Sequence, residues 1–383
     1  MNQHKMADGH SAAPKARYIM IGGFLGAGKT TAIGQLARLL TGQGLRVGLI
    51  TNDQGRDLAD TAMLRTQGFA TEEIPGGCFC CRFNSLVEAT SKLTAQNRPE
   101  VFIAEPVGSC TDLVATVTYP LRRLYGEDFI VAPVSVLMDP IRALRVFGLE
   151  KGGNFSEKVL YIYNKQIEEA DLVIISKSDL MDETRLKTLR DAVAAKFPRK
   201  EIMAVSARTG KNLEAWWARI TSEEQAAGQA MEVDYEIYAD GEARLGWLNA
   251  TMQLASNQPF DANVFLKQAA GEVQKRLRVR EAEVAHLKMT LSPDRSLLGE
   301  IAAVNLVRND FVPELSWELE GPVTGGQLIV NLRAEAAPEV LGLVVREAFE
   351  VTAKAFPGLN ATLDHLEHFR PGKPSPTHRF QAA

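Results

Sequence analysis

The sequence predicts an α/β fold, a mostly parallel sheet flanked by helices, followed by a smaller C-terminal α+β domain. In the first two hundred residues, short apolar runs typical of buried strands alternate with segments of helical period. Glycine-rich or acidic loops follow several of these runs. Beyond a polar segment near residue 225 the pattern changes to alternating strands and two amphipathic helices. A chain of 383 residues is long enough for two such domains.

Composition and charge restrict the classes of partner. Hydrophobic residues make up 45% and charged residues 23%, which is ordinary for a globular protein. A net charge of −4 gives no electrostatic reason to expect a nucleic acid or a membrane surface as partner. No apolar run approaches the roughly 18 residues of a membrane span, and residues 1–16 lack a signal-peptide core, so we expect a cytoplasmic protein. Four cysteines do not make a disulfide framework.

We expect five segments along the chain. They are a disordered tail over residues 1–16, an α/β domain over 17–221, a linker over 222–233, an α+β domain over 234–370 and a tail over 371–383. His4 and His10 of the first tail are interpreted as incidental rather than as metal ligands.

A glycine-rich loop joins the first predicted strand, Tyr18–Ile21, to a helix predicted over Thr31–Thr41. The loop fits the pattern Gly, four residues, Gly-Lys-Thr of a phosphate-binding loop. Glycines let backbone N–H groups converge on phosphate oxygens, and the helix N-terminus adds unsatisfied donors. We expect the nucleotide to contact Gly23, Leu25, Gly26, Ala27, Gly28, Lys29, Thr30 and Thr31.

Acidic residues follow the next two strands. Asp53 comes directly after the strand predicted over Arg46–Thr51, where it is either a contact for Mg²⁺ or water or part of an Asn-Asp-Gly turn. Glu105-Pro106-Val107-Gly108 follows the strand Val101–Ala104. A carboxylate here can hold Mg²⁺ through water, and the Gly108 N–H can contact a γ-phosphate. The expected catalytic residues are Lys29, Asp53, Glu105 and Gly108, and Thr30 and Glu105 are the expected magnesium ligands.

A cluster of cysteines, Cys78, Cys80 and Cys81, follows Pro75-Gly76-Gly77. The irregular backbone forced by Pro-Gly-Gly lets neighbouring thiols converge, and thiolates suit Zn²⁺ or Cu(I). Three sulfurs leave a tetrahedral ion one ligand short, and Cys110 is the remaining cysteine. We favour a metal site over a reactive or merely buried group of thiols.

A base-recognition motif follows two more strands, predicted over Ile130–Met138 and Leu172–Ile175. Asp179 can accept hydrogen bonds from the ring N–H and amine of guanine, a pattern that adenine does not offer. The Lys177 stem can pack on the base plane. We expect Ser176, Lys177 and Asp179 to bind the base, and the loop containing Ser206 and Ala207 to close over it.

The C-terminal half reads as strand, helix, strands, helix, strand. Strands are predicted over residues 245–254, around 287–291, over 297–306, around 317–319 and around 328–332. Helices are predicted over 262–280 and 338–356. His365 and His368 are interpreted as packing or surface residues rather than ligands.

With the phosphate loop, Glu-X-X-Gly, the cysteine cluster and the base motif in this order, the N-terminal half resembles the CobW-type GTPases, relatives of the nickel-insertion GTPases. The resemblance implies a P-loop GTPase domain with a parallel sheet, a metal site at Cys78, Cys80 and Cys81, and a C-terminal regulatory or partner-binding domain. It further implies delivery of a metal, Zn²⁺ or alternatively Co²⁺, to a metalloprotein or corrinoid-enzyme client linked to cobalamin. Homodimerisation is left open.

Three positions depart from the family pattern. Ser176 replaces the usual Asn of the base motif, Asp53 stands where Glu is frequent, and there is no His-rich stretch. The expected function is hydrolysis of GTP to GDP and phosphate with Mg²⁺, coupled to metal or metallocofactor handling. The alternatives are a nucleotide-gated chaperone for a corrinoid enzyme with purely structural thiols, and a P-loop small-molecule kinase.

Overall fold

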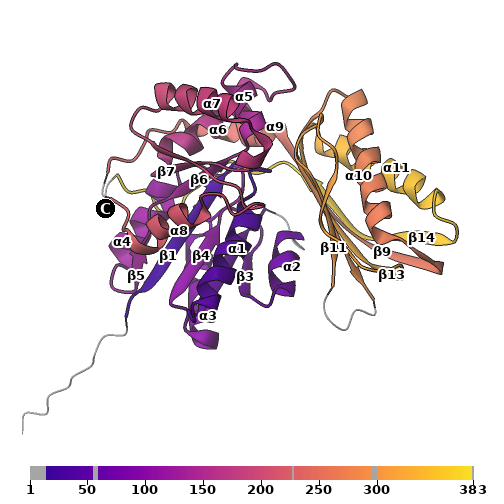
Figure 1. Cartoon of the computed structure of the whole chain (residues 1–383), viewed down its shortest axis with the longest axis horizontal. Coiled ribbons are helices and arrows are strands. Elements are labelled where there is room, and N and C mark those ends of the chain that lie inside the picture. Colours follow the sequence, from indigo (N-terminus) through magenta and orange to yellow (C-terminus); the bar gives the residue numbers. More distant parts are fainter. Residues whose placement is uncertain (1–13, 55–58, 227, 295–299, 382–383) are drawn as a thin grey trace, which may run out of the picture.

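The fold is described here from a computed structural model, which places residues 14–54, 59–226, 228–294 and 300–381 (Figure 1). Its first sheet is parallel throughout, with strand order β3-β2-β4-β1-β6-β7-β8 and with β5 also paired to β1. The strands are β1 (Ala16–Gly23), β2 (Val47–Asn52), β3 (Ala70–Ile74), β4 (Val101–Glu105), β5 (Phe129–Val131), β6 (Ser135–Met138), β7 (Leu172–Ile175) and β8 (Glu201–Ala204). The predicted α/β class with a mostly parallel sheet is confirmed.

Helices cover both faces of this sheet because its strands are apolar on both sides. On one face α1 and α8 pack against Ile19, Ile103 and Ile174. On the other face α3 to α7 pack against Tyr18, Phe102 and Val173. The helices are α1 (Lys29–Gly42), α2 (Ala59–Thr66), α3 (Phe83–Asn97), α4 (Tyr119–Leu124) with a π-helical turn before it (Val114–Thr118), α5 (Pro140–Val146), α6 (Glu157–Glu169), α7 (Glu183–Lys196), α8 (Leu213–Ser222) and α9 (Tyr235–Arg244).

The single strand expected over Ile130–Met138 is two strands, β5 and β6. The interruption spans residues 132–134 and contains Pro133, which has no N–H to donate to a ladder. Both short strands still pair with β1, so the order of the sheet is unaffected.

The second sheet is antiparallel, in the order β12-β11-β10-β13-β9-β14. Its strands are β9 (Leu245–Phe260), β10 (Glu283–Pro293), β11 (Ala302–Leu306), β12 (Glu314–Trp317), β13 (Val323–Glu335) and β14 (Leu359–Phe369). The helices α10 (Ala262–Val279) and α11 (Pro338–Lys354) cover one face, as Figure 1 shows. The other face carries polar side chains and lies against the first domain near α2. The predicted smaller C-terminal α+β domain is therefore present.

The ends of the C-terminal segment connect back to the first domain. Helix α9 packs on α6, and a Cβ at Gly241 would lie 2.4 Å from Lys158 O. Residues 371–381, expected as a tail, run along the first domain, where Thr377 N donates to Cys80 O at 2.9 Å (Figure 1). Residues 1–13 of the other expected tail, including His4 and His10, lie outside the described residues.

Among the described residues, no helix is both long enough and apolar enough to span a membrane.

Candidate functional site

The glycine-rich loop lies between the carboxyl end of β1 and the N-terminus of α1. Gly23, Gly26 and Gly28 adopt φ angles of 127°, 78° and 90°, in the region that side chains with a Cβ rarely occupy. Gly108 lies directly against the loop, since a Cβ there would be 3.0 Å from Leu25 N. The structure thus brings Gly108 to the phosphate loop, as the sequence predicted.

Four side chains meet behind this loop. Lys29 Nζ donates to Gly23 O at 2.9 Å. Thr30 Oγ1 lies 3.0 Å from Glu105 Oε1 and 2.5 Å from Asp60 Oδ1, within hydrogen-bonding distance of both carboxylates. Lys29, Thr30 and Glu105 were predicted from the sequence; Asp60, on α2, was not.

The electrostatics of this group follow from its burial. Burial raises the pKa of Glu105 to about 7, and Asp60 adds to that shift, while the Lys29 ammonium opposes it. Burial would also raise the pKa of Asp60, but Lys288 of β10 and other neighbours outweigh it and hold that pKa well below its usual range. Burial lowers the pKa of Lys29, which nearby Glu105 opposes.

These groups fit a magnesium ion. Glu105 Oε2 is buried and has no hydrogen-bond partner among the described residues, which leaves an oxygen ligand unused. Mg²⁺ prefers oxygen ligands and is typically held by few protein groups plus phosphates. The hydroxyl of Thr30 and the carboxylates of Glu105 and Asp60 supply such a set.

Asp53 takes a different position from the one its sequence context suggested. Its carboxylate pairs with Arg333 of β13, with Arg333 Nη2 at 2.9 Å from Asp53 Oδ1. Arg333 is buried and its guanidinium lies 4.1 Å above the Trp247 ring. Asp53 thus ties the loop after β2 to the C-terminal sheet, and its catalytic role stays a prediction.

The predicted base-binding residues come together at the ends of β7 and β8. Ser176 Oγ donates to Ala27 O at 2.7 Å, which ties the base motif to the phosphate loop. Lys177 Nζ donates to Gly26 O at 2.7 Å. Ser206 Oγ donates to Asp179 Oδ1 at 2.6 Å.

Ala207 completes this loop, since its carbonyl accepts a hydrogen bond from Gln35 of α1. The residues predicted to bind the phosphates and those predicted to bind the base therefore form one continuous surface. The hydroxyl of Ser176 holds the two parts together.

The three clustered thiols converge as predicted, in the turn before α3. The distance between the Cys78 and Cys81 sulfurs is 3.2 Å, and that between the Cys80 and Cys81 sulfurs is 3.6 Å. Cys78 and Cys80 are buried and Cys81 is half-buried. Among the described residues these three form the one group of His, Cys, Asp and Glu side chains with metal-ligand spacing.

Cys110 lies beside this group. Hydrogen bonding from the Cys110 thiol, and then from Cys80 and Cys81, lowers the pKa of Cys78 well below its usual range. The favoured thiolate is the form that binds metals. Glu242 of α9 is also buried nearby; burial and then the charge of Cys78 raise its pKa well above normal.

One short segment links the nucleotide and thiol groups. Glu105 contacts Thr30, Gly108 lies against Leu25, and Cys110 contacts Cys78, all within six consecutive residues. Gln166 of α6 holds this segment by donating to Gly108 O at 2.9 Å and to Cys110 O at 2.8 Å. The two groups are therefore joined by a buried connection.

Residues 371–381 cover the cysteine loop. Ser375 N donates to Cys81 Sγ at 3.2 Å, and Thr377 contacts the carbonyls of Cys80 and Cys81. Arg379 anchors the segment through an ion pair of 2.7 Å with the buried Asp112. No sequence pattern predicted this contact, because it joins residues about 300 positions apart.

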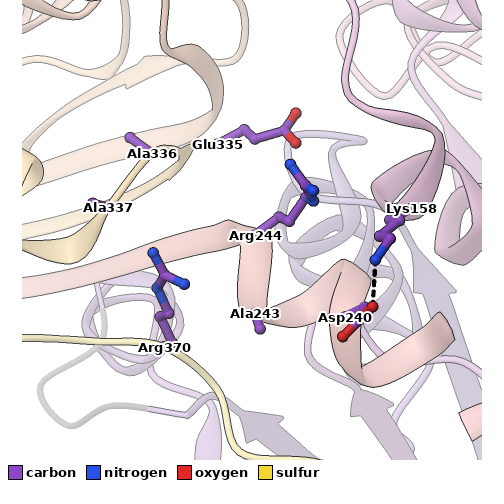
Figure 2. A pocket seen from close by; sticks show the side chains of 8 residues that line it. All are labelled: Lys158, Asp240, Ala243, Arg244, Glu335, Ala336, Ala337 and Arg370. Carbon is purple, nitrogen blue, oxygen red and sulfur yellow. Dashed lines mark hydrogen bonds and ion pairs between the residues drawn. The ribbon is translucent and has the colours of Figure 1, made fainter. Parts of the chain in front are cut away.

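A separate pocket lies between α6, α9 and the ends of β13 and β14 (Figure 2). Lys158, Arg244 and Arg370 face it together with Asp240 and Glu335, and Lys158 pairs with Asp240. None of the predicted site residues lines it.

Comparison with known proteins gives one family match. A family model described as the CobW/HypB/UreG nucleotide-binding domain matches residues 17–204. The "Zinc chaperone CobW" of Sinorhizobium sp is 32% identical over 213 residues, covering 50% of this chain and 59% of that protein. The "Zinc chaperone YeiR" of Escherichia coli is 30% identical over 170 residues, covering 42% of this chain and 46% of that protein. The chain thus spans about half the length of the curated relatives it matches.

Solved structures with a similar arrangement include two GTPase-family proteins. The hydrogenase maturation factor HypB from Archaeoglobus fulgidus is 19% identical, with a TM-score of 0.38, covering 53% of this chain and 87% of that one. Zn(II)-bound YjiA GTPase from E. coli is 12% identical, with a TM-score of 0.32, covering 89% of this chain and 99% of that one.

Proposed function

This chain belongs to the CobW/HypB/UreG family through its nucleotide-binding domain, and we propose that it hydrolyses GTP to drive the transfer of a metal ion to a client protein. The observation that carries the proposal is the segment from Glu105 to Cys110, which contacts the phosphate loop at one end and the thiol cluster at the other.

The hydrolytic step rests on positioning and electrostatics. The amides of the phosphate loop and Lys29 would stabilise charge on the transferring phosphoryl group. Thr30 and Glu105 would hold Mg²⁺, which when bound neutralises charge between the β- and γ-phosphates. Asp60 supplies a second carboxylate beside Thr30, in the position that the sequence assigned to Asp53.

Guanine selectivity rests on Asp179. Its Oδ1 is held by Ser206, which fixes the carboxylate while leaving its other oxygen for a base donor. Thr209 N in turn donates to Ser206 Oγ at 3.1 Å, so the acceptor is oriented before the base arrives.

The cargo that we propose is Zn²⁺, bound by Cys78, Cys80 and Cys81, with Co²⁺ as an alternative that the same thiolates accept. Relatives named zinc chaperones support Zn²⁺. We propose a cytoplasmic location, where thiols stay reduced, and a metalloprotein as client; a corrinoid enzyme linked to cobalamin is the narrower version.

Coupling between the two sites is the test. Zn²⁺ affinity is measured by competition with a chromophoric chelator, in Mg·GDP and in a non-hydrolysable GTP analogue. We expect affinities that differ about 5- to 150-fold between the two nucleotide states. The variant with Ser at all three cysteines should lose the metal and keep GTP binding, whereas Lys29→Ala should lose nucleotide binding and keep the metal.

Equal Zn²⁺ affinity in both nucleotide states would contradict the delivery mechanism while leaving the two sites in place. GTP turnover that survives unchanged in Lys29→Ala would contradict the nucleotide site itself.

A further inference from the structure

We propose that Lys288, on strand β10 of the C-terminal domain, is a residue of the nucleotide site and supplies positive charge to its γ-phosphate side. The inference rests on the proposed GTP hydrolysis and adds a residue to that site. It would make hydrolysis depend on the C-terminal domain being docked.

The phosphate loop and the C-terminal domain are in direct contact. A Cβ at Gly26 would lie 2.9 Å from Val307 Cγ1 and 3.2 Å from Ala285 O. Arg142, at the start of α5, donates to the carbonyls of Val284 and Val307. The C-terminal sheet therefore forms one wall of the nucleotide site and does not lie at a distance from it.

Lys288 extends from this wall to the magnesium-binding groups. Its ammonium pairs with Asp60 Oδ1, the same oxygen that lies 2.5 Å from Thr30 Oγ1. Thr30 in turn contacts Glu105. A cation of the C-terminal domain is thus separated from the proposed magnesium ligand Thr30 by a single carboxylate.

The burial of Lys288 distinguishes it from an ordinary surface contact. Its side chain is 7% exposed, and burying an ammonium is costly unless nearby charge compensates it. Two buried carboxylates, Asp60 and Glu105, share the space with two ammonium groups, Lys29 and Lys288. The neighbouring His286 adds no charge, because burial and Lys288 lower its pKa to about 3.

Other ion pairs between the domains already hold them together. Arg308 pairs with Asp139 at 3.0 Å, Arg333 pairs with Asp53, and Arg145 pairs with Asp310. None of these three arginines contacts Thr30 or Glu105. Docking alone therefore does not explain why a lysine ends at the carboxylate that contacts the Thr30 hydroxyl.

The charge has a defined use in the proposed reaction. Phosphoryl transfer spreads negative charge over the oxygens of the γ-phosphate, and a cation directed at them stabilises that charge. The first domain supplies Lys29 for this purpose. Lys288 supplies a second cation from the same chain, in the role that a partner's arginine fills in other GTP-hydrolysing proteins.

The test compares Lys288→Met with Lys288→Arg and with Asp310→Asn in the full chain. Met keeps the length and removes the charge; Arg restores the charge. Asp310→Asn is the control for docking, because it removes a charge that pairs with Arg145 and Arg308 away from the phosphate loop. Thermal unfolding of each variant checks that it folds.

We expect Lys288→Met to lower kcat for GTP about 10- to 100-fold. As a readout independent of turnover, its affinity for a non-hydrolysable GTP analogue relative to GDP should fall about 5- to 10-fold, because the lost charge faces the γ-phosphate. Lys288→Arg should recover most of both quantities. Asp310→Asn should stay within about twofold of the native protein in both.

Native kcat and an unchanged ratio of affinities in Lys288→Met would overturn the inference. Equal losses in Lys288→Met and Asp310→Asn would also overturn it, because the lysine would then act through docking alone. If the native chain neither binds nor hydrolyses GTP, the proposed function fails instead, and that result is distinct from either of these.

Discussion

Asp179 shows how much a single side chain decides at this site. Its carboxylate accepts a hydrogen bond from Ser206, and its second oxygen is available to the base. Replacing it with Asn exchanges an acceptor for a donor.

We therefore expect Asp179→Asn to weaken GTP binding about 10- to 100-fold and to improve binding of xanthosine triphosphate, whose extra carbonyl accepts a hydrogen bond. Fluorescence titration with both nucleotides measures this. Asp182→Asn, a change at the helix cap of α7, serves as control, and unchanged GTP preference in Asp179→Asn would contradict guanine recognition by this residue.

Glu169 at the end of α6 gives a prediction about pH. Burial, assisted by Asp112, raises its pKa to about 8 from a usual value of 4.5. The folded protein therefore holds this proton more tightly than the unfolded chain does, so stability is lost as pH rises from about 4.5 through about 8.

Glu169→Gln removes that penalty while the amide can still bond Val114 N and Thr111 Oγ1. At pH 9 the free energy of unfolding should rise by roughly 2–4 kcal/mol relative to the native protein, since one pKa unit is worth about 1.4 kcal/mol. Near pH 4.5 the difference should be small. Urea unfolding at both pH values checks this, with the more exposed Glu168→Gln as control; a gain independent of pH would refute the explanation.

At the scale of elements, the sequence predicted most of the strands and helices, because apolar periodicity reports which face of each is buried. Predicted Thr31–Thr41 corresponds to α1 and predicted 262–280 to α10, each within two or three residues. The cysteine loop and phosphate loop were recognisable because their residues are adjacent in the chain. Asp60, Glu242 and Lys288 were missed because their roles depend on contacts between distant elements.

The segment 371–381 is such a contact, and it covers the cysteine loop through Ser375 and Thr377. Removing residues 371–383 should expose Cys81 and speed both its reaction with a thiol reagent and the extraction of Zn²⁺ by a chelator. The expected increase is about 10-fold, as for loss of a few hydrogen bonds. Arg379→Gln, which removes the anchor on Asp112, should give a smaller increase in the same direction.

Rates equal to those of the native chain in both variants would show that this segment does not limit access to the thiols. Lys354→Gln, at an exposed position on α11, is the control for a change of charge alone.

At the scale of the whole molecule, the two domains share a core. Trp247 of β9 is fully buried among residues of the first domain's core, and it stacks on Phe369 and under Arg333. This arrangement predicts that the domains unfold together rather than one after the other.

Trp247→Ala should lower the free energy of unfolding by about 3–5 kcal/mol. The loss should appear equally in a probe of the first domain, such as Mg·GDP release, and in the far-UV signal of the whole chain. Trp317→Ala, on the exposed strand β12, should cost less than about 1 kcal/mol. Separate transitions for the two probes in the native chain would contradict the shared core.

The alternation of side chains along β10 has a mechanical consequence. Lys288 points to Asp60 on one face, while Leu287 and Met289 lie in the core beneath α10 and α11 on the other. Because neighbouring residues of one strand cannot slide past each other, any shear of the outer helices that moves Leu287 or Met289 must displace the Lys288 backbone by a similar amount. The sheet thus acts as a stiff plate one strand thick, and pushing on its outer side changes the position of a charge on its inner side with no intervening relay.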